Sequence, residues 1–100
     1  MHSYKNLGGG ASLTLSFYSI KRKCRKFFNE HPLIIPINKW ATAYALREYF
    51  GLTFKQIGEV LACNAATASK IHDTALLMAQ KKQKVKEIAK ELRFYILYYK

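Results

Sequence analysis

The sequence predicts a small all-α domain of about five helices, with a helix-turn-helix in its second half. Apolar residues recur with the 3.6-residue period of an amphipathic helix along most of the chain. Helix stop and start signals at Pro32, Gly51 and Thr53 divide this pattern into short segments. The apolar run 33–35 is too short, and too closely bounded by prolines, for a central strand, so we expect a connector that packs against the core.

The chain of 100 residues is long enough for one domain and too short for two. Residues 1–11 lack periodicity and contain three consecutive glycines, so we expect a flexible N-terminal arm followed by one domain over 12–100. The longest apolar run, 94–99, is far too short to span a membrane. The two cysteines, Cys24 and Cys63, are too few for a disulfide framework and favour a reducing cytosol.

The first predicted helix begins after Ser12, a favourable N-cap residue, and ends before Pro32. Its apolar stripe comprises Leu13, Phe17, Ile20, Cys24, Phe27 and Phe28. The other faces carry Lys21, Arg22, Lys23, Arg25 and Lys26. A charge run of this kind is ordinarily a solvated helix face, but next to a DNA-reading helix it can contact phosphates.

Two further helices are separated by Gly51. The first is predicted from about Asn38 to Phe50 and should bury Trp40, Ala41, Tyr44 and Ala45. The second opens at Thr53, because Thr53-Phe54-Lys55-Gln56 has the spacing of a capping box. Its core face should hold Phe54, Ile57, Val60 and Leu61. A glycine within this helix, Gly58, predicts a close helix approach at that point.

The turn 62–64 leads into a fourth helix, which Asn64 can cap. The inward side of this helix is predicted to hold Ala68, Ile71, His72, Ala75 and Ala79, with Met78 close by. The last apolar stripe comprises Val85, Ile88, Ala89, Leu92, Tyr95, Ile96 and Tyr99. The intervening stretch 80–84 holds no helix breaker, so a continuous helix over 64–99 is possible, whereas its run of like charges favours a bend; both remain open.

Net charge is the strongest functional signal in the composition. Lys and Arg number 17 against 6 Asp and Glu, which gives a formal charge of +11. An excess this large on so short a chain indicates a polyanionic partner, and an anionic membrane surface or nucleic acid would both satisfy it. A membrane-surface role would require residues 12–31 to detach from the core, so nucleic acid is the favoured partner.

Residues 53–79 have the build of a helix-turn-helix, in which the second helix enters the major groove of duplex DNA. The start of its first helix favours a phosphate, and small polar side chains lead its second helix. Lys70 could contact guanine or a phosphate, and Asn64 could pair with adenine unless it is occupied as a cap. The predicted DNA-binding residues are Lys21, Arg22, Arg25, Lys39, Thr53, Lys55, Gln56, Asn64, Thr67, Ser69 and Lys70.

The stretch from Arg47 to Gly58 resembles, without a gap, the entry to the helix-turn-helix in the C-terminal DNA-binding domain of the bacterial replication initiator DnaA, a domain of the Trp-repressor-like superfamily. Residues 24–28 resemble an earlier helix of that family, 44–46 its central helix, and 71–72 the pair after its recognition turns. The resemblance implies the same scaffold and a surface that faces DNA. It also implies a cytoplasmic protein that is associated with the nucleoid and acts in replication or transcription. We expect this domain to occur without the initiator's ATPase module.

At the recognition turns the family carries Gly-Gly and then Arg-Asp-His-Thr-Thr, whereas this chain has alanines at 62, 65, 66 and 68. The base-reading Asp-His pair falls on alanines, and Thr67 and Ser69 stand in for the threonines, so we expect modest sequence specificity. The turn is also similar to region four of sigma factors, with a comparable spacing of Ile, Leu, Cys and Thr.

Other functions have weaker support from the sequence. His72 is expected to be a satisfied, part-buried histidine rather than a ligand or a base, and no spacing suggests a metal, a cofactor or a nucleophile–base pair, so we expect no enzyme. A protein-interaction module that binds an acidic partner is the main alternative. The aromatic residues at 94, 95, 98 and 99 exceed what one buried face requires and are candidates for a homodimer contact.

Overall fold

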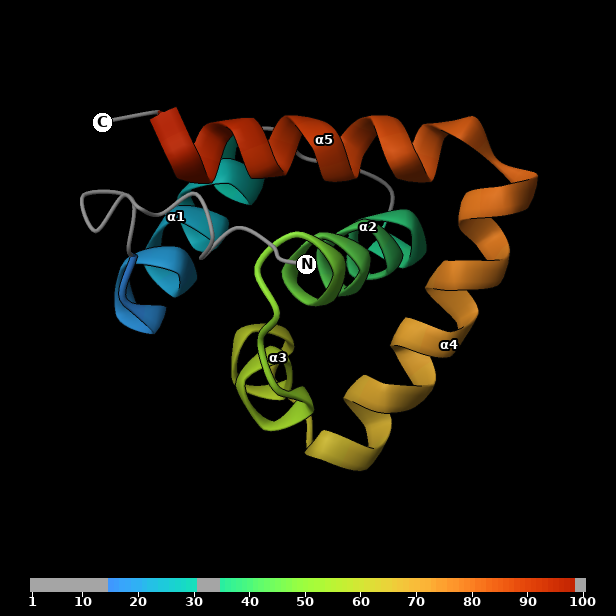
Figure 1. Ribbon diagram of the computed structural model, residues 1–100, viewed down its shortest axis with the longest axis horizontal. Helices are drawn as coiled ribbons and strands as arrows, with labels where there is room; N and C mark the ends of the chain where they lie inside the picture. The colour runs from blue at the N-terminus through green and yellow to red at the C-terminus, as the bar shows by residue number, and fades with distance from the viewer. Residues whose placement is uncertain (1–14, 31–34, 99–100) are drawn as a thin grey trace.

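The computed structural model describes residues 15–30 and 35–98 and confirms the all-α fold, with no strand in these two ranges (Figure 1). Its helices are α1 (Phe17–Glu30), α2 (Ile35–Glu48), α3 (Phe54–Leu61), α4 (Ala65–Lys81) and α5 (Gln83–Tyr98). The predicted arm 1–11, the cap at Ser12, Leu13, residues 33–34 of the connector and Tyr99 lie outside the described residues.

The central element is α2, which packs against α3, α4 and α5 and appears in the middle of Figure 1 with the other helices around it. Ala41, Thr42, Ala43, Ala45 and Leu46 are fully buried. Short side chains allow neighbouring helices to approach from several directions, so α2 is buried on more than one face. The predicted burial is confirmed for Ala41 and Ala45 and was too high for Trp40 and Tyr44, which are half-buried.

The bounds of α2 also differ from the sequence-based prediction. The helix begins at Ile35 rather than near Asn38, because Pro36 lies in the first turn, where an amide hydrogen is not needed. It ends at Glu48 rather than Phe50, and Gly51 follows in the left-handed region at φ +66°. The amides of Gly51 and Leu52 donate to the carbonyl oxygens of Arg47 and Leu46, which closes the end of the helix.

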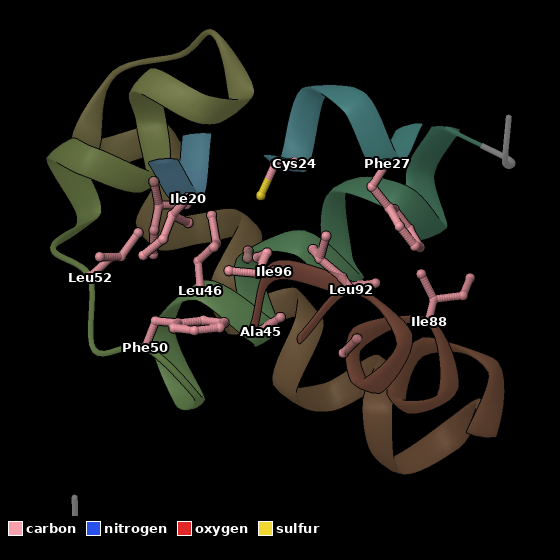
Figure 2. Packing of buried hydrophobic residues seen from close by; sticks show 14 of the residues in the cluster. Ile20, Cys24, Phe27, Ala45, Leu46, Phe50, Leu52, Ile88, Leu92 and Ile96 are labelled. Carbon is pink, nitrogen blue, oxygen red and sulfur yellow. The ribbon is translucent and has the colours of Figure 1, made fainter. Parts of the chain in front are cut away.

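Buried residues of α1, α2 and α5 supply most of the core, and Figure 2 shows Ile20, Leu46 and Leu92 among them. The described part of the predicted α1 stripe is confirmed, with Ile20, Cys24 and Phe27 buried and Phe17 and Phe28 half-buried. However, the helix begins later than predicted. Its cap is Ser16 rather than Ser12, since the Oγ of Ser16 accepts a hydrogen bond from the amide of Ser19 at 3.1 Å.

A bend separates α4 from α5, which answers the question that the sequence left open. Lys82 is extended, with φ −126° and ψ 108°. Its amide still donates to the carbonyl of Met78, and its own carbonyl accepts from Val85, so the backbone stays hydrogen-bonded through the corner. From this corner α5 returns across α2 (Figure 1), with the whole predicted stripe from Val85 to Ile96 buried.

Candidate nucleic-acid interface

The helix-turn-helix is formed by α3, the turn 62–64 and α4. At its start the predicted capping box is present: the amide of Gln56 donates to Thr53 Oγ1 at 3.1 Å, and the amide of Thr53 donates to Gln56 Oε1 at 3.0 Å. Lys55 is exposed between them. This start therefore offers the hydroxyl hydrogen of Thr53, the amide group of Gln56 and the charge of Lys55 to a ligand.

The turn after α3 is held by tight backbone contacts. Ala62 adopts the left-handed conformation at φ 62°, and the amide of Cys63 donates to the carbonyl of Gly58 at 2.8 Å. A Cβ atom at Gly58 would collide with the Cys63 carbonyl oxygen and lie 3.2 Å from the carbonyl group of Asn64. The close approach predicted at Gly58 therefore exists, but its partner is the turn that follows and not another helix.

Asn64 caps α4, because its Oδ1 accepts a hydrogen bond from the amide of Thr67 at 2.8 Å. A paired contact with adenine would need that oxygen, so the capping role predicted for Asn64 is the one the structure supports. Beyond the cap, Thr67 and Lys70 are exposed and Ser69 is half-buried. The exposed surface of the first two turns also contains Ala65, Ala66 and Asp73.

A cluster of four side chains fixes α4 against α2 and α3. His72, only 7% exposed, has its Nε2 2.8 Å from Glu48 Oε2. Its ring also contacts that of Phe54, with centroids 5.6 Å apart. The guanidinium of Arg47 lies 4.3 Å from the centre of the Phe54 ring and donates to the carbonyl of Leu52 at 2.9 Å. His72 is thus satisfied as expected, whereas sequence reasoning missed Glu48 as its partner.

The basic face of α1 adjoins this unit. Lys21 Nζ lies 3.8 Å from Glu59 Oε1 of α3, so this predicted phosphate contact is also engaged within the protein. Lys23 donates to the carbonyl of Ile96 at 3.0 Å and so joins α1 to α5. Arg22 and Arg25 are exposed. The structure therefore brings the α1 cations next to α3, with Arg22 and Arg25 open to a ligand.

Two predicted basic regions lie away from the turn. Lys39 is exposed near the start of α2, at the opposite end of that helix from the α2–α3 loop. The lysines of the run 81–86 lie around the α4–α5 corner, about 24 Å along α4 from Ala65 at 1.5 Å per residue. A surface that used them together with the turn would have to extend along the whole of α4.

The fold and this geometry define a class: a small all-α domain that presents a helix-turn-helix. No model of a protein family, no curated protein and no solved structure matches the chain. Across residues 15–30 and 35–98, His, Cys, Asp and Glu side chains nowhere gather in threes around a space that could hold a metal ion. In the same ranges no helix is both long and apolar enough to cross a membrane.

Proposed function

We propose that the protein binds double-stranded DNA, with α4 in the major groove, as a domain similar to the C-terminal DNA-binding domain of DnaA. The observation that supports this most is the first two turns of α4. They are fixed from within by the Asn64 cap and by His72, and their outer surface, with Thr67 and Lys70, is exposed. A reading helix needs this combination of rigid support and open polar surface.

In this proposal two sets of cations set the affinity through phosphates. The first is at the start of α3, where Lys55 is exposed between the two residues of the capping box. The second is the exposed pair Arg22 and Arg25 on α1. The methyl side chains of the alanines at 65 and 66 cannot form hydrogen bonds to bases, so sequence specificity is modest. Such a protein would act at the nucleoid in replication or transcription.

Duplex binding at two salt concentrations tests the proposal. With one phosphate contact each for Lys55, Lys70, Arg22 and Arg25, log K should fall with log salt at a slope of roughly −3 to −4. Selection from a random duplex pool would then give the preferred site. A chain that leaves every duplex unshifted at low salt would refute the proposal.

Lys70→Ala tests whether α4 lies in the interface. If Lys70 holds a phosphate, the variant should weaken binding to all duplexes about equally and reduce the salt slope by about 1. Loss confined to one sequence would identify Lys70 as a base contact. Lys90→Ala, an exposed lysine of α5, is the matched control. Equal affinities for the Lys70 and Lys90 variants would exclude α4 from the interface.

A protein-interaction module on the same scaffold is the second candidate function. It is favoured by Phe94 and Tyr98 on α5, which are 66% and 64% exposed and have ring centroids 4.7 Å apart. The same pair is the proposed homodimer contact, whereas Tyr95 is buried and belongs to the core. Phe94→Ala with Tyr98→Ala should leave duplex binding unchanged if DNA is the partner of α4. Loss of duplex binding in this variant would contradict that division of roles.

A further inference from the structure

Two helix stripes, one on α1 and one on α5, expose aromatic side chains. Five large apolar side chains are exposed in the described part of the chain, and three of them are Tyr18 on α1 and Phe94 and Tyr98 on α5. Each of these two helices already uses its opposite face in the core, with Cys24 on α1 and Leu92 on α5 buried. The aromatic groups are therefore not required to complete the fold.

The exposed stripe on α1 begins with an aromatic residue and continues with two basic residues. Tyr18, Arg22 and Arg25 follow at helical spacing and are all exposed, and the Arg22 guanidinium lies 5.9 Å from the centre of the Tyr18 ring. Arg25 lies about 10 Å along the helix from Tyr18. This stripe could contact an acidic and aromatic surface.

The α5 stripe has the complementary composition. Glu87 and Glu91 precede Phe94 and Tyr98 on the same outward side, and all four are exposed. Within residues 15–30 and 35–98, no ion pair involves either glutamate. Lys90 lies on the other flank of Phe94. In a protein with net charge +11, this acidic and aromatic stripe is a poor surface for phosphates and a good one for a basic and aromatic surface.

The two stripes match when the helices run antiparallel. Both place a charged side chain seven residues from an aromatic one, a separation of about 10 Å in each helix. An antiparallel arrangement would put Glu87 near Arg25, Glu91 near Arg22, and Phe94 near Tyr18. The stripes face outward from one molecule and cannot meet each other there, because α1 and α5 pack together through Phe27 and Tyr95, with ring centroids 5.3 Å apart.

We propose that a second copy of this chain docks head to tail, with its α5 stripe against the α1 stripe of the first. Such a contact is heterologous, so each copy keeps one free stripe and further copies can add to the chain. It goes beyond the proposed DNA binding and competes with it, because Arg22 and Arg25 cannot hold a phosphate and a glutamate at once. The contact is weak and depends on ionic strength. At physiological salt, where the Debye length is about 8 Å, the repulsion between the net charges of two copies is screened. Ion pairs that are in direct contact are screened much less.

Charge reversal on each stripe tests the contact. Sedimentation velocity of the full chain at physiological salt should show a mean mass that rises with concentration. Arg22→Glu with Arg25→Glu, and separately Glu87→Lys with Glu91→Lys, should each raise the dissociation constant about tenfold or more, because like charges would face each other. All these positions are exposed, and circular dichroism verifies that each variant is folded.

The decisive measurement is an equimolar mixture of the two variants. Each variant retains one native stripe and one reversed stripe. The two native stripes can pair across the mixture, and so can the two reversed ones, so association should return when the variants are combined. A mixture that stays monomeric, or a wild-type chain that stays monomeric at all concentrations, would overturn the proposal. Self-association that neither variant weakens would assign the contact to another face. These outcomes concern self-association alone, and duplex binding by the wild-type chain is measured separately. Arg22→Glu with Arg25→Glu should also weaken duplex binding, whereas Glu87→Lys with Glu91→Lys leaves both proposed phosphate contacts in place.

Discussion

Replacing Gly58 by alanine should destabilise the protein, although alanine is the better helix former. Helix propensity alone predicts a gain of about 0.5–1 kcal/mol. The new Cβ, however, would collide with the Cys63 carbonyl oxygen, and the nearby atoms belong to the backbone and cannot rotate away. Overpacking of this kind costs about 1–3 kcal/mol. We therefore expect a net loss of about 1 kcal/mol, within a range of about 0–2.5 kcal/mol.

Replacing Ala62 by glycine, in the turn that follows α3, should instead stabilise the protein. Ala62 is held at φ 62°, where a residue with a Cβ loses about 1–2 kcal/mol. Ala62→Gly removes this strain and costs about 0.5–1 kcal/mol in chain entropy, so a net gain of about 0–1.5 kcal/mol is expected. Gly51→Ala separates the two causes, because Gly51 has φ +66° and nothing within 4 Å of its Cβ position.

Thermal unfolding followed by far-UV circular dichroism measures all three variants. For a domain of this size about 1 kcal/mol shifts Tm by about 4–8 °C. Gly58→Ala and Gly51→Ala should lower Tm, and Ala62→Gly should raise it. Well below Tm, Gly58→Ala should also weaken duplex binding, since the turn that orients α4 must move. A Gly58→Ala variant with raised Tm would refute the reasoning, because the turn would then yield at no cost.

Three further predictions concern the cap, the buried histidine and the thiols. Thr53→Ala should lower stability by about 1 kcal/mol, whereas Thr53→Ser should keep the capping box and most of the stability, as urea unfolding can measure. Glu48→Ala should cost about 1–3 kcal/mol, because the buried Nε2 of His72 loses its partner; unchanged stability would show that water replaces the carboxylate. Burial raises the pKa of the Cys24 thiol to about 12, so a thiol reagent near pH 8 should modify Cys63 alone until the protein unfolds. Two equally fast modifications in the native state would contradict this.

Local signals in the sequence predicted the helix-turn-helix well. The capping box at Thr53, the cap at Asn64 and the inward side of α4 each depend on residues within one or two turns of each other. The start of α1 was placed one turn early, since Ser12 and Ser16 both precede the same apolar stripe and only the tertiary structure chooses between them.

Other features depend on contacts between distant residues. Because α2 packs against α3, α4 and α5, its apolar residues do not form a single stripe. No pattern therefore indicated which of its apolar side chains are the most buried, and the predicted burial of Trp40 and Tyr44 was too high. The bend at Lys82 has no breaker residue; packing of α5 across α2 accounts for it. Glu48 and His72 are 24 residues apart, so no local pattern could pair them. The engagement of Lys21 with Glu59 was missed for the same reason.

The alanine-rich surface of α2 also affects how this domain could change over evolution. Ala41, Ala43 and Ala45 have no exposed surface, so even one added methyl group would press on a neighbouring helix. The packing of α2 against its neighbours, α4 among them, thus depends on small side chains inside the fold. A small substitution there could shift α4 while every outward-facing residue stays the same.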